Sequence, residues 1–191
     1  MLIAAGEGRR LRPLTERWPK PLLPIDGKPV VATLLHEFAG AGIDTVTVVV
    51  GHLGDQIRRL LAGIDVRFAH QPEPLGSADA VRHAVEAGAT PPFVVSAADT
   101  LYADGDVRRF VATWERSGAP GALAPPLWGL GPRLVGYLEG LPGPPYELRT
   151  AFRRAAEDGH EPVEVELGPM RHLTRPADVV SHNFVYLEHR R

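Results

Sequence analysis

The stretch AAGEGRRLRPLTERWPKPLLPIDGKP, residues 4–29, decides the fold of this chain. It extends the apolar run of residues 2–5 into a loop rich in glycine, proline and arginine, and it holds the only two lysines of the sequence, Lys20 and Lys28. Glycines directly after a first strand let main-chain N–H groups approach an anion closely. The stretch therefore predicts a loop that binds phosphate or a nucleotide.

Two common phosphate-binding motifs are excluded. A third glycine would complete the GxGxxG pattern begun by Gly6 and Gly8, but Leu11 stands at that position. The GKP of residues 27–29 lacks the Ser or Thr that follows the lysine of a P-loop. The specific feature of the loop is its continuation into RPLT and PKPLLPIDGKP.

The composition limits the class of protein. With 191 residues, of which 21 are basic and 23 acidic, the chain is long enough for one domain and carries no field strong enough to bind nucleic acid non-specifically. It has no cysteine, which excludes disulfides, thiolate metal sites and a cysteine nucleophile. The apolar residues 1–5 are too few for a signal peptide or a membrane span. We expect a cytoplasmic protein that binds neither nucleic acid nor membranes, and the sequence leaves the oligomeric state open.

Short apolar runs alternate with amphipathic stretches along the first part of the chain. The runs rich in β-branched or aromatic residues predict strands at 2–5, 45–51, 66–70 and 93–98. The amphipathic stretches predict helices at 30–41, 54–62, 77–87 and 106–117. Strands that are apolar on both faces and alternate with helices are typical of a parallel sheet covered on both sides. We therefore predict an α/β, doubly wound, Rossmann-like fold with a mostly parallel sheet.

The later part of the chain is less regular. It predicts strands near 120–125 and 133–139, a helix at 147–158, a strand at 162–168 and a terminal helix that begins at Pro176. Within the earlier helix at 54–62, we expect Ile57, Leu60 and Leu61 to form one buried face, because they are spaced at i, i+3 and i+4.

Asp99 directly follows the predicted strand at 93–98. In this fold class ligands bind beyond the carboxyl ends of the strands, so this carboxylate is placed to reach a ligand. Mg²⁺ prefers oxygen ligands and commonly takes only one or two carboxylates, with phosphates and water completing its shell. Asp99 is therefore a candidate Mg²⁺ ligand, and the alternative is an aspartate that caps a helix or a turn.

Residues 3–29 resemble the signature of the sugar-1-phosphate nucleotidyltransferases, roughly (L/I)AAGxGxRLxPLTxxxPKPLxPIxGKP. The resemblance continues along most of the chain in four further segments: GHLGDQI, QPEPLGSADAV (71–81), AAD (97–99) and residues 146–168. It implies a GT-A-like nucleotidyltransferase fold. It also implies an enzyme that joins a nucleoside triphosphate to a sugar 1-phosphate and releases pyrophosphate, with Mg²⁺ as cofactor.

The resemblance assigns a role to each candidate residue. Nucleotidyl transfer joins two anions, so catalysis requires cations and alignment rather than a covalent nucleophile. Arg10 would hold the leaving β- and γ-phosphates, and Lys20 would lie near the α-phosphate and the acceptor phosphate. The remaining candidates are the nucleotide cradle of Ala5, Gly6 and Gly8, the base contacts Gln71, Gly76 and Ser77, and the Mg²⁺ ligand Asp99. Because a glutamine amide can pair with more than one base, the nucleotide stays open.

The sequence departs from the family at the second metal ligand. The family has a D(V/I)GTPxD motif there, and the nearest match is HLTRPAD, residues 172–178. This alignment puts His172 in the aspartate position, although imidazole is a poor ligand for Mg²⁺. Asp178 is retained, but its distance from Arg175 and Pro176 favours a helix cap. The second metal position is therefore His172, Asp178 or no protein residue at all.

The acceptor site is also different. Many family members have an EKP segment whose lysine binds the sugar phosphate, and residues 98–146 contain none. We expect one nucleotidyltransferase domain over 1–191, with a nucleotide-binding half at about 1–105 and a short acceptor-binding half at about 106–191. Two alternatives to the sugar 1-phosphate reaction stay open. One is transfer to a non-sugar phosphate acceptor, and the other is a catalytically weak regulatory paralogue that binds nucleotides or sugar phosphates.

Overall fold

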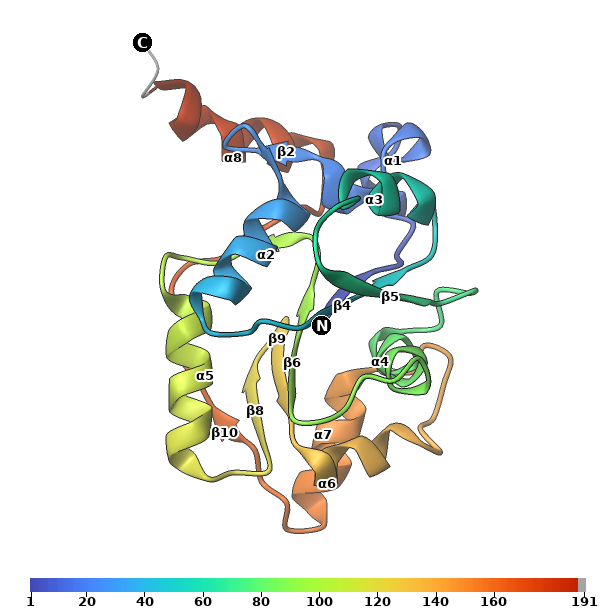
Figure 1. Ribbon diagram of the computed structural model, residues 1–191, viewed down its shortest axis with the longest axis vertical. Coiled ribbons are helices and arrows are strands. Elements are labelled where there is room, and N and C mark those ends of the chain that lie inside the picture. Colours follow the sequence, from blue (N-terminus) through green and yellow to red (C-terminus); the bar gives the residue numbers. More distant parts are fainter. Residues whose placement is uncertain (189–191) are drawn as a thin grey trace.

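The computed structural model describes residues 1–188 and is built around a seven-stranded sheet in the order β10-β8-β9-β6-β1-β4-β5 (Figure 1). The strands of this sheet are β1 (Leu2–Ala4), β4 (Val46–Val50), β5 (Val66–His70), β6 (Phe93–Ala97), β8 (Gly121–Ala124), β9 (Leu127–Leu130) and β10 (Val163–Glu164). Strand β9 is antiparallel to both of its neighbours, and all other pairs are parallel. The prediction of a mostly parallel sheet is confirmed.

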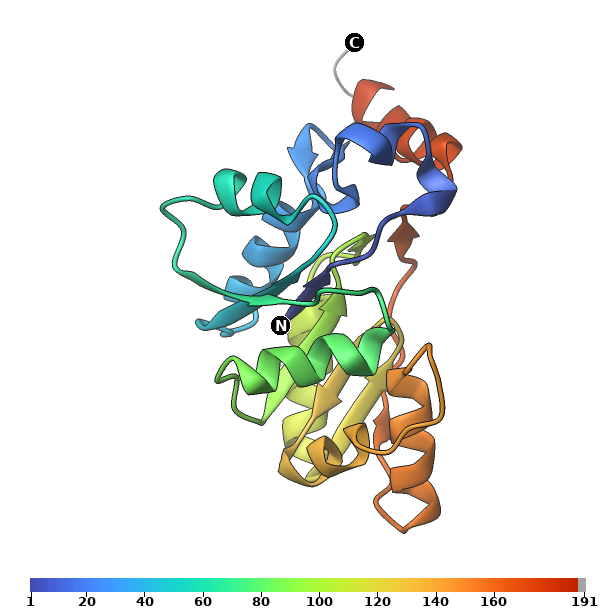
Figure 2. The ribbon, with the colours of Figure 1, turned by 90° about the vertical axis from the view of Figure 1, so that its right-hand side faces the viewer.

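Helices cover both faces of the sheet. The first face packs against α2 (Val30–Gly40), α3 (Gly54–Leu60) and α5 (Asp106–Ser117), and the second against α4 (Ser77–Glu86), α6 (Pro132–Val135) and α7 (Leu148–Glu157). Consecutive residues of β4 alternate between the two cores, since Val48 and Val50 belong to the first and Val49 to the second. Figure 2 shows α4 and α7 on the second face. The doubly wound architecture that the sequence predicts is therefore confirmed.

Two local predictions were wrong. Residues 133–139 do not form a strand, because Pro132 begins α6 and a 3-10 turn at Gly136–Leu138 follows it. Leu134 and Leu138 lie one helical turn apart and are both buried, a spacing that a short strand pattern cannot distinguish from a helix. Ile57 of α3 and Leu61, which directly follows the helix, are buried as expected, but Leu60 is 41% exposed.

The opening stretch forms a series of short elements instead of one loop. After β1 come a 3-10 turn (Arg9–Leu11), α1 (Leu14–Arg17), a second 3-10 turn (Lys20–Leu22) and a hairpin of β2 (Pro24–Ile25) and β3 (Lys28–Pro29). Gly8 has a φ of 63°, and a Cβ there would lie 2.8 Å from Cγ2 of Thr15. Only glycine fits this position without strain. Lys28 is exposed in the hairpin, whereas Lys20 is partly buried.

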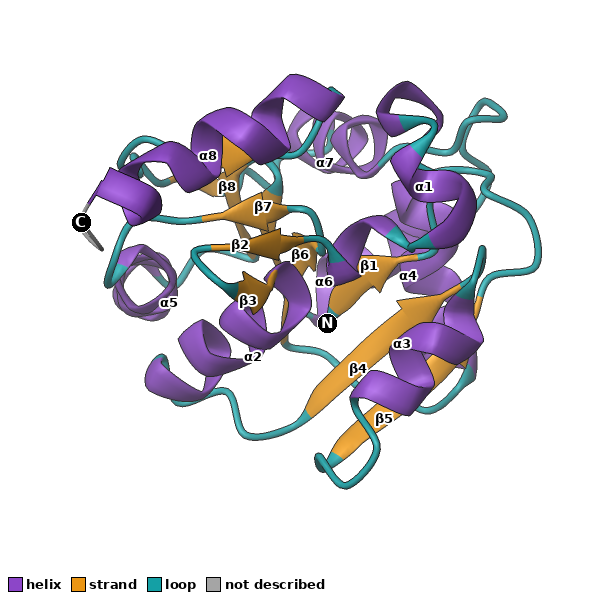
Figure 3. Ribbon diagram, turned by 90° about the horizontal axis from the view of Figure 1, so that it is seen from above, coloured by secondary structure: helices purple, strands orange, loops and turns teal. Residues whose placement is uncertain are grey.

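The last part of the chain returns to the opening stretch. Strand β11 (Arg171–His172) pairs antiparallel with β7 (Thr100–Leu101), and α8 (Pro176–Glu188) lies beside the β2–β3 hairpin (Figure 3). Asn183 of α8 donates its side-chain amide to the carbonyl of Pro24 and accepts the N–H of Asp26. None of the helices within residues 1–188 has both the length and the apolar character needed to cross a membrane.

Candidate functional site

The predicted site residues follow four neighbouring strands at the carboxyl edge of the sheet. Across this edge the strand order is β6, β1, β4, β5, so the loops that contain Asp99, Gly6, Gly51 and Gln71 are neighbours in that order. The outer two strands are three strand spacings apart, about 14 Å. A Cβ on Gly51 would lie 2.9 Å from the carbonyl oxygens of both Ala5 and Gln71, so the inner loops are in close contact. This edge can hold an extended ligand.

A cavity of about 320 Å³ lies at the β6–β1 end of this edge. Its lining includes five of the predicted residues and one that the sequence did not indicate: Gly6, Gly8, Arg10, Lys20, Asp99 and Thr174. Ala5 is buried next to the cavity, where its carbonyl accepts the N–H of His52. Glu7, between the two glycines, pairs with Arg9, whereas the guanidinium of Arg10 has no ion pair within residues 1–188.

Lys20 and Asp99 form an ion pair inside the cavity. The side chains are only 15% and 26% exposed, so the contact is partly shielded from water. Lys20 begins a 3-10 turn and is flanked by the extended Pro19 and the buried Pro21. The prolines restrict the main chain on both sides of the lysine, which fixes the direction from which its ammonium enters the cavity.

Asp99 is also connected to His172 through one hydroxyl group. Oγ1 of Thr100 donates to Oδ1 of Asp99 at 3.2 Å and lies 3.0 Å from Nδ1 of His172. A hydroxyl has a single proton, and here Asp99 accepts it, so Nδ1 of His172 must be the donor in the second bond. The segment that contains His172 therefore lies beside Asp99, as the family resemblance implies. The main chain makes the same connection, because Leu173 donates its N–H to the carbonyl of Asp99 at 3.0 Å.

Asp178 lies in the first turn of α8 and hydrogen-bonds to the main chain at the start of this helix. Its Oδ2 accepts the main-chain N–H groups of Thr174 and Arg175, each at 2.7 Å. These two hydrogen bonds lower the pKa of Asp178 below its ordinary value, because they favour the ionised carboxylate. The contact is the helix cap that the sequence offered as the alternative to a metal ligand.

The donor set at the cavity fits one Mg²⁺ ion. Within residues 1–188, no three acidic or histidine side chains gather into a cluster that could hold a metal by themselves. Asp99 supplies one carboxylate at the end of a strand, in a cavity whose other charged residues, Arg10 and Lys20, are suited to phosphate. Mg²⁺ bound to substrate phosphates commonly needs no more than one or two carboxylates from the protein.

Gln71, Gly76 and Ser77 lie at the β5 end of the edge, outside the lining of this cavity. The buried Gln71 donates from Nε2 to the carbonyl of Gly76 at 3.1 Å and to Oδ2 of Asp79 at 2.8 Å. Gly76 has a φ of 116°, and a Cβ there would collide with the main chain of Tyr146. Ser77 donates its hydroxyl proton to Glu147 and accepts the N–H of Leu148, so it joins α4 to α7.

Sequence reasoning missed several polar residues that support the site. Thr100 is completely buried, and Asp79 is 3% exposed. Behind Asp99, Oγ of Ser96 and the hydroxyl of Tyr102 lie 2.7 Å apart. Burial raises the pKa of Tyr102, so its hydroxyl stays neutral. Thr100 directly follows Asp99 and Tyr102 lies three positions after it, which was the only sequence signal for these two residues. Asp79 was part of the segment 71–81 but was not singled out in it.

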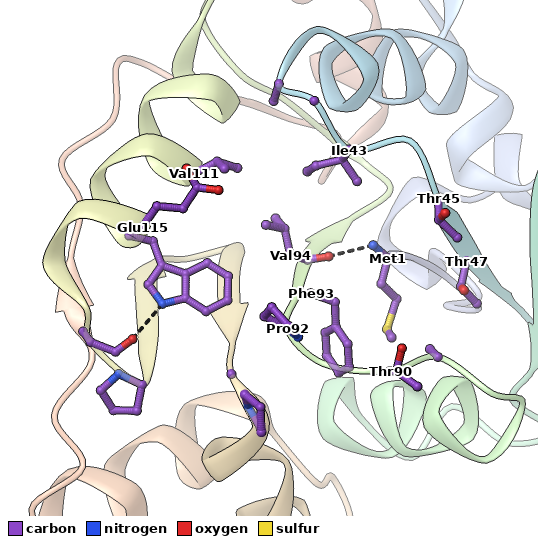
Figure 4. Close-up of a pocket in the computed structure, with 18 of the residues that line it drawn as sticks. Met1, Ile43, Thr45, Thr47, Thr90, Pro92, Phe93, Val94, Val111 and Glu115 are labelled. Carbon is purple, nitrogen blue, oxygen red and sulfur yellow. Dashed lines mark hydrogen bonds between the residues drawn. The ribbon is translucent and has the colours of Figure 1, made fainter.

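A larger cavity, of about 970 Å³, lies at the opposite edge of the sheet (Figure 4). It is lined by residues at the amino ends of the strands, such as Met1, Thr45 and Phe93. The amino group of Met1 donates to the carbonyl of Val94 at 2.6 Å, and burial lowers its pKa to about 5. None of the predicted site residues lines this cavity. The larger of the two cavities therefore lies away from the residues that the sequence predicts as site residues.

An α/β sheet with a glycine loop, two cations and a carboxylate at its carboxyl edge is an arrangement suited to phosphorylated ligands. The chain belongs to the family of MobA-like NTP transferase domains, which matches residues 1–162. This confirms, at the level of the family, the resemblance that the opening stretch carries.

Two curated relatives are informative. The N-acetylmuramate alpha-1-phosphate uridylyltransferase of Neisseria meningitidis is 34% identical over 134 residues, which are 67% of this chain and 57% of that protein. The CMP-5'-(3-aminopropyl)phosphonate synthase of Streptomyces rubellomurinus is 40% identical over 78 residues, which are 39% of this chain and 12% of that protein. This chain therefore spans less than two thirds of the length of either relative.

Solved structures share the whole architecture. A UDP-glucose pyrophosphorylase from Acinetobacter baumanii matches with a TM-score of 0.81, covering 98% of this chain and 93% of that chain, at 18% sequence identity. At this identity the likeness concerns the fold, and it confirms the nucleotidyltransferase fold predicted from the sequence.

Proposed function

We propose that this chain transfers a nucleotidyl group from a nucleoside triphosphate to a sugar 1-phosphate, giving a nucleotide sugar and pyrophosphate. The observation that carries the proposal is the cavity in which Arg10, Lys20 and Asp99 meet beside the glycine loop. Membership of the NTP transferase family supports a nucleoside triphosphate as donor. The name of the Neisseria relative, a uridylyltransferase for N-acetylmuramate alpha-1-phosphate, supports a sugar 1-phosphate as acceptor.

In the proposed reaction an oxygen of the acceptor phosphate forms a bond to the α-phosphorus, and the bond from that phosphorus to the β-phosphate oxygen breaks. Arg10 holds the departing pyrophosphate through its planar, bidentate guanidinium. Lys20 moves from Asp99 to the α-phosphate and acceptor phosphate, where a compact ammonium offsets the charge that develops. The main chain of Ala5, Gly6 and Gly8 orients the triphosphate.

Asp99 is the residue that would hold Mg²⁺. The ion, when bound with the substrate phosphates, supplies charge neutralisation and alignment of the α-phosphorus. Because Asp178 already accepts two main-chain N–H groups, we assign no metal contact to it. His172 reaches the site through Thr100, and we propose that it positions Asp99 through this hydroxyl.

We propose one catalytic domain with two functional halves. The nucleotide would bind along residues 1–105, with its phosphates at the β6–β1 cavity and its base at Gln71, Gly76 and Ser77. The acceptor would contact residues 106–191. Both substrates are small phosphorylated metabolites of the cytoplasm, where we place the reaction, and neither a nucleic acid nor a membrane takes part.

A second candidate is transfer to a non-sugar acceptor. The Streptomyces relative, whose name describes a CMP derivative of an aminopropylphosphonate, favours this alternative, and so does the absence of an EKP lysine. A third candidate, a regulatory paralogue with little activity, rests on His172 in place of the family's aspartate.

A substrate matrix tests the three candidates. Pyrophosphate release is measured with Mg²⁺ for each nucleoside triphosphate combined with sugar 1-phosphates, with phosphocholine and with 3-aminopropylphosphonate. We expect release with at least one sugar 1-phosphate. Release only with the other acceptors would favour the second candidate. No release from any pair, although nucleotides raise the melting temperature, would favour the regulatory one.

A further inference from the structure

Helix α8 is attached to the rest of the protein mainly through polar side chains. The amide of Asn183 makes two hydrogen bonds to the β2–β3 hairpin, each at 3.0 Å. Next to it, Nε2 of His182 lies 3.1 Å from the carbonyl of His172. Among the residues of α8 whose side chains the structure describes, Val179 is the only apolar one that packs against the core. Hydrogen bonds therefore hold the inward face of α8 in place.

The outward face of α8 is apolar and carries no charge. Its exposed residues, within the part of the helix whose side chains the structure describes, are Pro176, Ala177, Val180, Ser181 and Phe184. Val180 is 63% exposed and Phe184 is 58% exposed, on a helix at the periphery of the molecule (Figures 1 and 3). A surface helix usually directs its apolar side chains at the core and its charges at solvent. In α8 this polarity is reversed, which indicates that a further surface covers the outward face.

The spacing of the apolar residues in α8 is that of a contact between two helices. Residues 177, 180, 184 and 187 are Ala, Val, Phe and Leu, so the intervals are three, four and three. Such intervals form a narrow stripe along which two helices pack side by side. A membrane surface fits this α8 stripe less well, because helices that lie on membranes are rich in lysine and arginine, and residues 176–188 contain neither.

The α8 stripe is complementary to an antiparallel copy of itself. With residue 182 at the centre, Val180 of each copy lies opposite Phe184 of the other, so a small side chain meets a large one twice. Glu188 ends the helix and Arg175 directly precedes it, so opposite charges come together at both ends of the pair. A parallel copy would place Phe184 against Phe184 and like charges side by side.

We propose that this protein forms a two-fold symmetric dimer in which α8 packs antiparallel against α8 of a second copy. The interface is isologous, because the same stripe serves both copies. Two helices of 13 residues, each about 20 Å long, bury less surface than the roughly 1,200 to 2,000 Å² of a standard interface. The dimer is therefore weak, and its population depends on the protein concentration.

The first test measures the association of the whole chain. Sedimentation velocity is recorded at about 1 to 500 µM, the range in which small interfaces associate. We expect dimers at the upper end, and a melting temperature that rises with protein concentration. Phe184→Glu places a charge in the stripe and should raise the dissociation constant about tenfold or more. Ile64→Glu is the matched control, because Ile64 is 48% exposed in the turn after α3, and it should leave the dissociation constant unchanged.

The second test determines the orientation of the two helices. The chain has no cysteine, so single cysteines can be introduced without side reactions. In the antiparallel pair, the two copies of residue 181 are about 3 Å apart along the helix axes and the two copies of residue 177 about 15 Å, at about 1.5 Å per residue. A short bis-maleimide should therefore link Ser181→Cys into covalent dimers and leave Ala177→Cys monomeric. Both positions are exposed on α8, so chance collisions would link them equally.

Three outcomes would overturn the proposal. One is a chain that stays monomeric at every concentration, including a monomer that binds vesicles containing phosphatidylserine and so covers its stripe with a membrane. Another is a folded Phe184→Glu variant that dimerises as well as the unaltered chain. The third is equal cross-linking of the two cysteine variants, which excludes the antiparallel pair. If Phe184→Glu does not fold, the cysteine variants decide, because each replaces a small exposed side chain.

Discussion

Nδ1 of His172 lies 3.0 Å from Oγ1 of Thr100, whose hydroxyl in turn donates to Asp99. Residues that are more than seventy positions apart in the sequence are thus joined by a single threonine. The family's second acidic residue would carry a negative charge at this position, whereas His172 contributes a donor that is directed at Thr100. The arrangement fits a site with one carboxylate that is held in place by its neighbours.

Asp99→Ala should abolish most of the turnover. Loss of the carboxylate removes the metal contact and leaves Lys20 without its partner, and we expect the rate of pyrophosphate release to fall by about 10² to 10³-fold, as for other single electrostatic contributions. Glu16→Ala, an exposed acidic residue of the same stretch, is the control. Circular dichroism verifies the fold of both variants. Near-normal activity of Asp99→Ala would contradict the assignment of Asp99 as a metal ligand.

Lys20→Arg tests the need for a compact cation. The charge is kept, but the guanidinium is larger and presents a planar fork of donors instead of a compact ammonium. We therefore expect kcat to fall by roughly 10²-fold. Lys28→Arg is a matched control, since Lys28 is the only other lysine and is exposed in the β2–β3 hairpin. An equal rate for both variants would assign Lys20 a role that any cation fulfils.

His172→Asp should strengthen the binding of Mg²⁺. A second carboxylate near Asp99 adds an oxygen ligand, and we expect the Mg²⁺ concentration for half-maximal rate to fall about tenfold. The Mg²⁺-induced rise in melting temperature should grow in parallel, which gives a readout that does not need turnover. His172→Ala measures the Thr100 contact alone. If neither variant changes the rate or the Mg²⁺ response, the position is idle.

Asp178→Ala tests the cap of α8 through pH. The depressed pKa means that the ionised carboxylate stabilises the folded protein above the ordinary value of 3.8, and that this contribution is lost as the pH falls through the lower folded value. We expect a loss of about 1 kcal/mol in the free energy of unfolding at pH 7, typical of a removed cap. Denaturant titrations should give curves for the two proteins that converge below pH 3.8. A difference that is independent of pH would contradict the capping role.

Gly8→Ala and Gly6→Ala together test which of the two glycines is required by the fold and which only by ligand binding. Gly8 has a φ of 63° and would bring a Cβ against Thr15, whereas nothing lies within 4 Å of a Cβ on Gly6. We expect Gly8→Ala to lower the free energy of unfolding by about 1 to 2 kcal/mol, the cost of a left-handed residue other than glycine. Gly6→Ala should fold normally and affect only nucleotide binding. Equal stabilities would contradict this reading of Gly8.

The sequence predicted most of the elements that build the sheet, because buried strands and amphipathic helices have distinct periods. It placed Lys20 and Asp99 at one site only through the family signature, and it did not predict their ion pair, since no local pattern links residues 79 positions apart. Short elements such as α6 and β9 were misplaced, because a few apolar residues fit either period. The burial of Asp79 was not predicted, because an acidic residue in an amphipathic helix is expected on the exposed face.

The contacts of residues 171–174 with Asp26 and Asp99 have a consequence for folding during synthesis on the ribosome. The family match ends at residue 162, but Thr174 lines the cavity, Leu173 bonds to the carbonyl of Asp99, and Arg171 pairs with Asp26. A nascent chain that has emerged only as far as residue 162 can pair β1, β4, β5 and β6 but still lacks Thr174 in the cavity wall. Residues 171–174 therefore complete the cavity wall, and the cavity is closed only after this segment has left the ribosome.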